Sequence, residues 1–164
     1  MCLITLQDKP FVAENDIVCY KRVVINKFNG FVSPVFKRKI PNAVISGKRL
    51  YSGRGIFRRA YRDPVFPWVN IVDRGWIHTY TAAPIFFHGN DGVWFECVIP
   101  KGTKYWKSKD RDEYASRSIR FVKPCEEQIR ALFSFANGRF PTKEELSEIV
   151  GSIGKAKEFF KKFA

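Results

Sequence analysis

The stretch spanning residues 94–122 constrains the fold most, because it predicts three strands joined by one tight turn and one charged loop. Along its first strand, Phe95, Cys97 and Ile99 fall on one face while the intervening residues fall on the other. Pro and Gly then favour a turn, since Pro presets φ and Gly tolerates positive φ. The predicted segments are a strand at Trp94–Ile99, a turn at Pro100–Thr103, extended Tyr105 and Trp106, a loop at Lys107–Glu113 and a last strand over Ile119–Val122.

The rest of the chain extends this sheet and then changes character. The β-branched run Ile17–Ile25 predicts a central strand, and Asn29-Gly30 predicts a hairpin turn to a partner at Phe31–Phe36. After residue 123 the pattern becomes helical, with a capping box formed by Thr142 and Glu145. We therefore expect an α+β fold: a twisted, mainly antiparallel sheet domain at residues 1–123, followed by a three-helix C-terminal segment at 124–164.

Composition indicates a folded cytoplasmic protein. In 164 residues, 45% are hydrophobic and 16% aromatic, which is enough for one core. No apolar run approaches the ~18 residues of a membrane span, and the N-terminus lacks the pattern of a signal peptide. The four cysteines contain no C-x-x-C pair, which favours buried free thiols over disulfides. We expect no membrane partner.

Positive charge is concentrated in the predicted sheet domain. The net charge is +13, and Lys37–Arg62 contains nine basic residues and no acidic one, whereas residues 125–164 carry seven Lys/Arg and six Asp/Glu. Such a concentration of positive charge attracts polyanions. Alternatively, the charge only keeps the protein soluble. We expect the partner to be nucleic acid, or an acidic protein that handles nucleic acid, such as a host defence factor. The predicted binding residues are Lys37, Arg38, Lys39, Lys48, Arg49, Arg54, Arg58, Arg59, Arg62 and Lys107.

Aromatic residues are interleaved with these basic groups. Tyr51, Phe57 and Tyr61 offer ring faces on which the bases of a single strand stack while Lys and Arg take the phosphates. Alternatively, Tyr51 and Phe57 point into the core and only the charged groups face solvent. The periodicity of this stretch does not assign its faces, so both interpretations stay open.

The sequence offers little for catalysis. His78 and His88 lie ten residues apart, which is not a metal-ligand spacing, and a lone His in a strand is more often structural. Cys2 becomes an N-terminal nucleophile only if Met1 is removed, and no oxyanion motif follows it. We therefore expect a non-enzymatic binding protein without a cofactor or metal.

Three resemblances bear on this expectation. Tyr20-Lys21, the Gly75–His78 element and the Ala115–Ile119 strand resemble a family of uncharacterised phage and gut-bacterial proteins, which implies a phage or mobile-element type of protein. Residues 125–164 are similar to helix-turn-helix segments. That likeness implies a recognition helix at Ile153–Phe163, with contact positions at Ser152, Lys155, Lys157 and Lys161.

The third resemblance implies an alternative function. The order of segments around His78-Thr79-Tyr80, ECVIPKGTKY and YASRSIRF is similar to the ADP-ribosyltransferase superfamily. Members place a Glu on the last motif, where this chain has Ser116-Arg117-Ser118, so the resemblance implies a degenerate enzyme. The residues that it implies for catalysis are His78, Tyr80 and Glu113.

Overall fold

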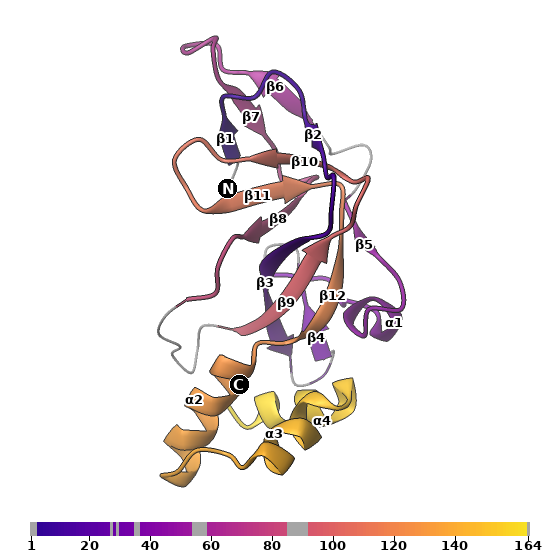
Figure 1. Ribbon diagram of the computed structural model, residues 1–164, viewed down its shortest axis with the longest axis vertical. Helices are drawn as coiled ribbons and strands as arrows, with labels where there is room; N and C mark the ends of the chain where they lie inside the picture. The colour runs from indigo at the N-terminus through magenta and orange to yellow at the C-terminus, as the bar shows by residue number, and fades with distance from the viewer. Residues whose placement is uncertain are drawn as a thin grey trace. The chain divides into compact units, whose positions relative to one another are not determined.

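The computed structural model describes residues 3–26, 28, 30–34, 37–53, 59–84 and 92–163. It has the expected α+β fold, mainly antiparallel sheet with a C-terminal helical segment (Figure 1). The strands are β1 (Leu3–Thr5), β2 (Phe11–Val12), β3 (Ile17–Asn26), β4 (Gly30–Val32), β5 (Tyr51–Ser52), β6 (Ala60–Arg62), β7 (Asn70–Val72), β8 (Ile77–Tyr80), β9 (Val93–Ile99), β10 (Lys104–Lys107), β11 (Glu113–Ser116) and β12 (Ser118–Pro124). The helices are α1 (Asn42–Ile45), α2 (Glu126–Asn137), α3 (Lys143–Val150) and α4 (Ile153–Lys161).

The chain forms two compact units that are interleaved along the sequence. Strands β3, β9 and β12 contribute residues to both, and the three C-terminal helices belong to the second unit. The expected division at residue 123 into two domains stays a prediction. The first unit comprises Met1–Lys21, Leu50–Ala82 and Cys97–Arg120, and the second comprises Arg22–Arg49, Ala83–Glu96 and Phe121–Ala164.

The first unit contains a small sheet and part of a larger one, which also includes residues of the second unit. The strand order of the larger one is β2-β10-β11-β8-β3-β9-β12-β5, and the smaller one is ordered β1-β7-β6. Its buried cluster joins Leu3 and Val72 of the small sheet to Trp106 and Ala115 of the large one, with Trp76 between. The rings of Trp76 and Trp106 meet edge to face with centroids 6.0 Å apart.

The second unit combines a hairpin with the helices. Strands β3 and β4 pair antiparallel, with Val24 opposite Val32. Phe95 is fully buried and meets Phe31 and Phe121 edge to face at centroid distances of 5.4 and 5.3 Å. Helix α2 is attached to β9 by the buried Gln128, whose Oε1 accepts from the Trp94 backbone N–H at 2.8 Å.

Several predicted elements are confirmed, with shifted ends. In β9, Phe95, Cys97 and Ile99 are all buried while Glu96 and Val98 are half-buried, as alternation predicts. Two elements differ from expectation. Glu113 begins strand β11 rather than ending a loop, because Tyr114 and Ala115 pair with β8. Residues 42–45 form a short helix that buries Val44 and Ile45, an element that the sequence pattern did not predict.

Candidate nucleic-acid interface

The predicted binding residues are divided between the two units. Lys37, Arg38, Lys39, Lys48 and Arg49 belong to the second unit, and we call these five the basic surface. Arg59, Arg62 and Lys107 belong to the first unit. Arg54 and Arg58 lie outside the described residues.

A backbone turn centred on Ser33 presents the first three members of the basic surface. Ser33 is buried; its N–H donates to the Arg38 carbonyl at 2.8 Å, and its Oγ accepts from the Arg38 N–H at 3.2 Å. Lys37 closes the turn at φ 52 and donates its N–H to the Ser33 carbonyl at 3.0 Å. Lys39 pairs with Val32 in an isolated bridge. The backbone is fixed while the three side chains are exposed.

Helix α1 positions the other two members. Val44 and Ile45 anchor it in the core at 4% and 1% exposure. The Arg49 N–H donates to the Ala43 carbonyl at 2.9 Å, which folds the following turn back onto the helix. Lys48 and Arg49 are exposed on that turn. Apolar anchors and backbone bonds thus hold the chain, so that the cations are free to contact a partner.

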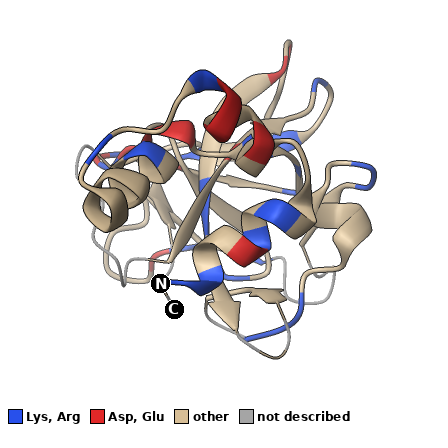
Figure 2. Ribbon diagram, turned by 90° about the horizontal axis from the view of Figure 1, so that it is seen from below, with Lys and Arg blue, Asp and Glu red and all other residues tan. Residues whose placement is uncertain are grey.

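No carboxylate neutralises the basic surface within the described part of the chain. None of its five side chains forms an ion pair there. The surrounding segment, Arg22–Arg49, contains seven Lys/Arg and no Asp or Glu. In contrast, the C-terminal helices carry both signs (Figure 2). Their pairs include Arg130–Glu126 at 3.8 Å and Lys155–Glu148 at 3.2 Å.

One lysine of α4 lies against the β4 hairpin. A Cβ on Gly30 would lie 3.1 Å from both Cε and Nζ of Lys157. Gly30 also has φ +74, a conformation that favours glycine. The close approach of Lys157 therefore depends on glycine at this position, and it places a further cation beside the strand that leads to the basic surface.

Arg59 and Arg62 are bound by carboxylates. Arg59 Nε lies 3.5 Å from Asp73 Oδ2, and Arg62 pairs with Asp8 at 3.2 Å while also donating to the Pro67 carbonyl at 2.8 Å. Both arginines are exposed, so each pair contributes little stability. They nevertheless reduce the positive field at these arginines. Lys107 is exposed and its backbone N–H donates to Gln7 Oε1 at 2.6 Å.

The interleaved aromatic residues do not share one environment. Tyr51 is half-buried in β5, and burial raises the pKa of its hydroxyl. Tyr61 in β6 is 50% exposed. Phe57 lies outside the described residues. Tyr51 is therefore partly buried, closer to the interpretation in which it points into the core. Solvent reaches the ring of Tyr61.

The alternative catalytic residues share one face of the first unit's large sheet. Glu113 is directly opposite Tyr80 in the β11–β8 register, and His78 is two residues along β8. His78 Nε2 donates to the Asp73 backbone carbonyl at 2.9 Å, so a backbone group orients the ring rather than a carboxylate. Burial lowers the pKa of His78, and the nearby Lys21 ammonium lowers it further.

Lys21, in the first unit, has a pKa well below that of an ordinary lysine. Its Nζ donates to the His78 carbonyl at 2.8 Å. Burial lowers the pKa of Lys21 to about 8 and raises that of the neighbouring Cys19 thiol to about 11. In strand β3, Cys19 is buried and Lys21 is half-buried, so both groups are less accessible to an incoming polyanion than the exposed lysines are.

The positions implied by the helix-turn-helix resemblance are mostly engaged within the segment. The Ser152 hydroxyl caps α4 by accepting from the Lys155 N–H at 3.1 Å. Lys155 pairs with Glu148, Lys157 lies against Gly30, and Lys161 is 3.8 Å from Glu158. A role in duplex recognition would have to compete with these contacts, and it stays untested.

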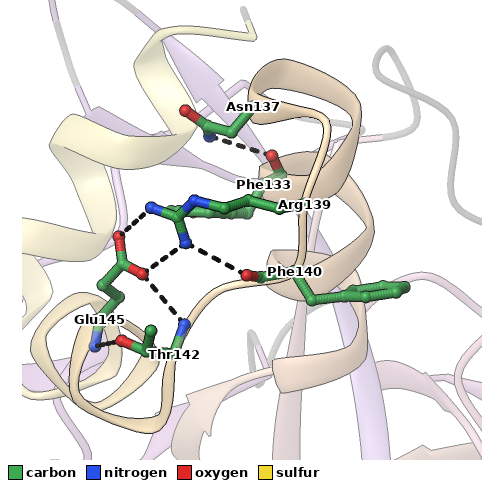
Figure 3. A network of polar contacts seen from close by, with 6 residues as sticks. All are labelled: Phe133, Asn137, Arg139, Phe140, Thr142 and Glu145. Carbon is green, nitrogen blue, oxygen red and sulfur yellow. Dashed lines mark hydrogen bonds and ion pairs between the residues drawn. The ribbon is translucent and has the colours of Figure 1, made fainter.

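A polar network fixes the turn between α2 and α3. Arg139 donates to both oxygens of Glu145 at 2.8 and 3.1 Å, and its guanidinium carbon lies 5.1 Å from the centre of the Phe133 ring (Figure 3). Glu145 completes the capping box with Thr142, with bonds of 3.0 and 3.1 Å. The hydrogen bonds from Arg139 are the main cause that lowers the pKa of Glu145 to about 2. The charges of Arg139 and Glu145 are therefore paired with each other within the C-terminal segment.

Sequence reasoning missed an aromatic row in the first unit. Phe11, Tyr105 and Tyr114 come from three different strands and meet in succession, with ring centroids 5.8 and 5.9 Å apart. The only sequence signal was the alternation Tyr105-x-Lys107, which places both side chains on one face.

Among the described residues, no group of three or more His, Cys, Asp or Glu is arranged to hold a metal ion. Within the same residues, no helix is long and apolar enough to cross a membrane. No protein-family model, curated protein or solved structure matches the chain. The function proposed below therefore rests on the residues themselves.

Proposed function

We propose that the protein is a nucleic-acid-binding protein whose basic surface contacts phosphates. One observation carries the proposal: five exposed Lys and Arg side chains project from an anchored backbone, and the segment that holds them contains no carboxylate. Unpaired exposed cations lose little when they meet a phosphate, because no internal ion pair has to break first. Binding of this kind releases condensed counterions and is independent of sequence.

Backbone hydrogen bonds of the described residues support the same proposal. Arg38 is bonded to Ser33 through its N–H and its carbonyl, and the Arg49 N–H is bonded to the Ala43 carbonyl of α1. Only the side chains need to be ordered when a partner binds, which limits the entropic cost to about 0.5–1.5 kcal/mol for each immobilised side chain. Arg can also contact phosphate through two parallel hydrogen bonds.

A charge-matched pair of variants tests the proposal. The first variant replaces all five members of the basic surface with Ala. The control replaces the same number of Lys and Arg elsewhere, all of them exposed, so that net charge falls equally. The control residues are Lys101, Arg120, Arg130, Lys143 and Lys162.

Affinity for labelled single-stranded and duplex oligonucleotides is measured by fluorescence anisotropy at one low salt concentration. We expect the basic-surface variant to bind at least about tenfold more weakly, because several phosphate contacts are lost, and the control to lose far less. Equal losses in both variants would contradict the proposal, since net charge alone would then explain binding. If the wild-type protein binds no oligonucleotide, the partner is an acidic protein instead.

A further inference from the structure

Strands β2, β10 and β11 are neighbours at one end of the large sheet (Figure 1). Trp106 and Ala115 pair across β10 and β11 and belong to the buried cluster. Tyr105 and Tyr114 are their immediate neighbours in sequence and so point to the opposite face. Phe11, directly opposite Tyr105, joins them on that face.

These three residues form a row of rings that solvent reaches. The centroids of Phe11 and Tyr105 lie 5.8 Å apart, and those of Tyr105 and Tyr114 lie 5.9 Å apart. Phe11 is 50% exposed, and both tyrosines are half-buried. We call Phe11, Tyr105 and Tyr114 the aromatic row. Both pairs are edge to face, with interplanar angles of 64° and 79°, so a nucleobase stacks only on a ring face that the neighbouring ring leaves open.

Charge differs between the two ends of the aromatic row. Lys107 is exposed and lies directly opposite Tyr114 on the same face, which suits a phosphate. At the other end, Phe11 and Tyr105 line a groove of about 550 Å³ that also includes Glu14 and Asn15. A carboxylate repels phosphate, yet it accepts hydrogen bonds from the exocyclic amino group of a base. The groove therefore suits a base edge and not a phosphate.

From this arrangement we propose that the aromatic row binds single-stranded nucleic acid, with bases stacked on Phe11 and Tyr105 and the backbone passing Lys107. The inference deepens and rests on the proposed function, because it names the form of nucleic acid. It uses a different set of residues, in the other compact unit, so the two can fail separately. A duplex offers no free base faces to the rings, which makes a single strand the partner that these side chains fit.

The test compares two labelled oligomers of equal length, an oligocytidylate, whose bases carry an exocyclic amino group, and an abasic strand with the same phosphates. Both are titrated by fluorescence anisotropy at low salt. The wild-type protein should bind the oligocytidylate at least about fivefold more tightly, since stacking on an aromatic residue contributes about 1–3 kcal/mol per base. The double variant Phe11→Leu/Tyr105→Leu should bind both oligomers alike, because leucine keeps apolar bulk but has no ring face.

Three controls separate stacking from loss of structure. Tyr105→Phe keeps the ring and should retain the preference. Phe140→Leu removes a ring that is 70% exposed in the C-terminal segment and should leave the preference unchanged. Thermal melting of each variant shows whether it is folded, and if the leucine double variant is not, Phe11→Leu alone at the exposed edge strand replaces it.

The outcomes distinguish the two proposals. If the basic-surface variant weakens both oligomers equally while the base preference stays, both proposals hold. If the wild-type protein binds the two oligomers equally, or if the leucine variants keep the preference, the aromatic row only stabilises the sheet and this inference is wrong. If neither oligomer binds, both proposals are wrong.

Discussion

Gln128 shows how one side chain attaches a helix to a strand. It is completely buried, its Oε1 accepts from Trp94 N–H, and its Nε2 donates to the Gly92 carbonyl, both at 2.8 Å. Gln128→Leu keeps the volume but leaves two backbone groups unpaired, at about 1–3 kcal/mol each. Urea unfolding should show this loss. Arg130→Leu, exposed on the same helix, should change stability by less than about 0.5 kcal/mol; a similar change in both variants would contradict the role of Gln128.

Lys21 makes stability depend on pH in a defined direction. Burial lowers its pKa from 10.5 to about 8 on folding. Between these values the unfolded chain holds a proton that the folded protein has released. Stability therefore rises with pH across this window, because the cost of burying the ammonium disappears. The unfolding free energy of wild type minus that of Lys21→Met should rise from pH 8 to 10.5. A constant difference would show that Lys21 keeps an ordinary pKa.

At the scale of elements, the C-terminal helices are expected to brace the sheet rather than to read DNA. Phe159 and Phe160 of α4 are 8% and 2% exposed, and their rings lie 5.2 Å apart. Phe160→Ala should therefore lower stability by about 3–5 kcal/mol. Lys155→Ala breaks only an exposed ion pair with Glu148 and should cost at most about 1 kcal/mol.

The same pair of variants addresses the alternative. Thermal unfolding reports the effect on stability, and titration with duplex DNA reports the effect on binding. Weaker duplex binding by Lys155→Ala, together with an unchanged melting temperature of Phe160→Ala, would reverse the interpretation and identify α4 as a recognition helix.

Elements that depend on neighbouring residues were predictable from the sequence. The turn before β10 places Gly102 at φ +86, a conformation that glycine adopts at no steric cost. Both hydrogen bonds of the Thr142–Glu145 capping box are also present. Strand β11 was not predictable, since Glu113 follows a run of charges and the segment is extended because it pairs with β8 and β10. Helix α1 depends in the same way on the burial of Val44 and Ile45.

In the candidate site too, some features were predictable from local sequence and others were not. Exposure of the five cations of the basic surface follows from their charge, so composition was enough to find them. The bonds that bind Arg59 to Asp73 and Arg62 to Asp8 join residues 14 and 54 positions apart, which no local pattern reveals. The aromatic row likewise gathers Phe11, Tyr105 and Tyr114 from distant strands.

At the scale of the whole molecule, both compact units are basic. The first contains 14 Lys/Arg and eight Asp/Glu, and the second contains 15 and eight. Net charge therefore does not distinguish them. The distribution of acids does, because every Asp and Glu of the second unit lies outside Arg22–Arg49. This segregation is what favours phosphate binding by the basic surface.

The salt dependence of binding tests that central claim most directly. The logarithm of the association constant for a single-stranded oligonucleotide is measured against the logarithm of salt concentration, for wild type, the five-residue basic-surface variant and its charge-matched control. Each lost phosphate contact should reduce the slope by about 0.7. We predict a clearly flatter slope for the basic-surface variant and a slope close to wild type for the control. Identical slopes for wild type and the basic-surface variant would contradict the account.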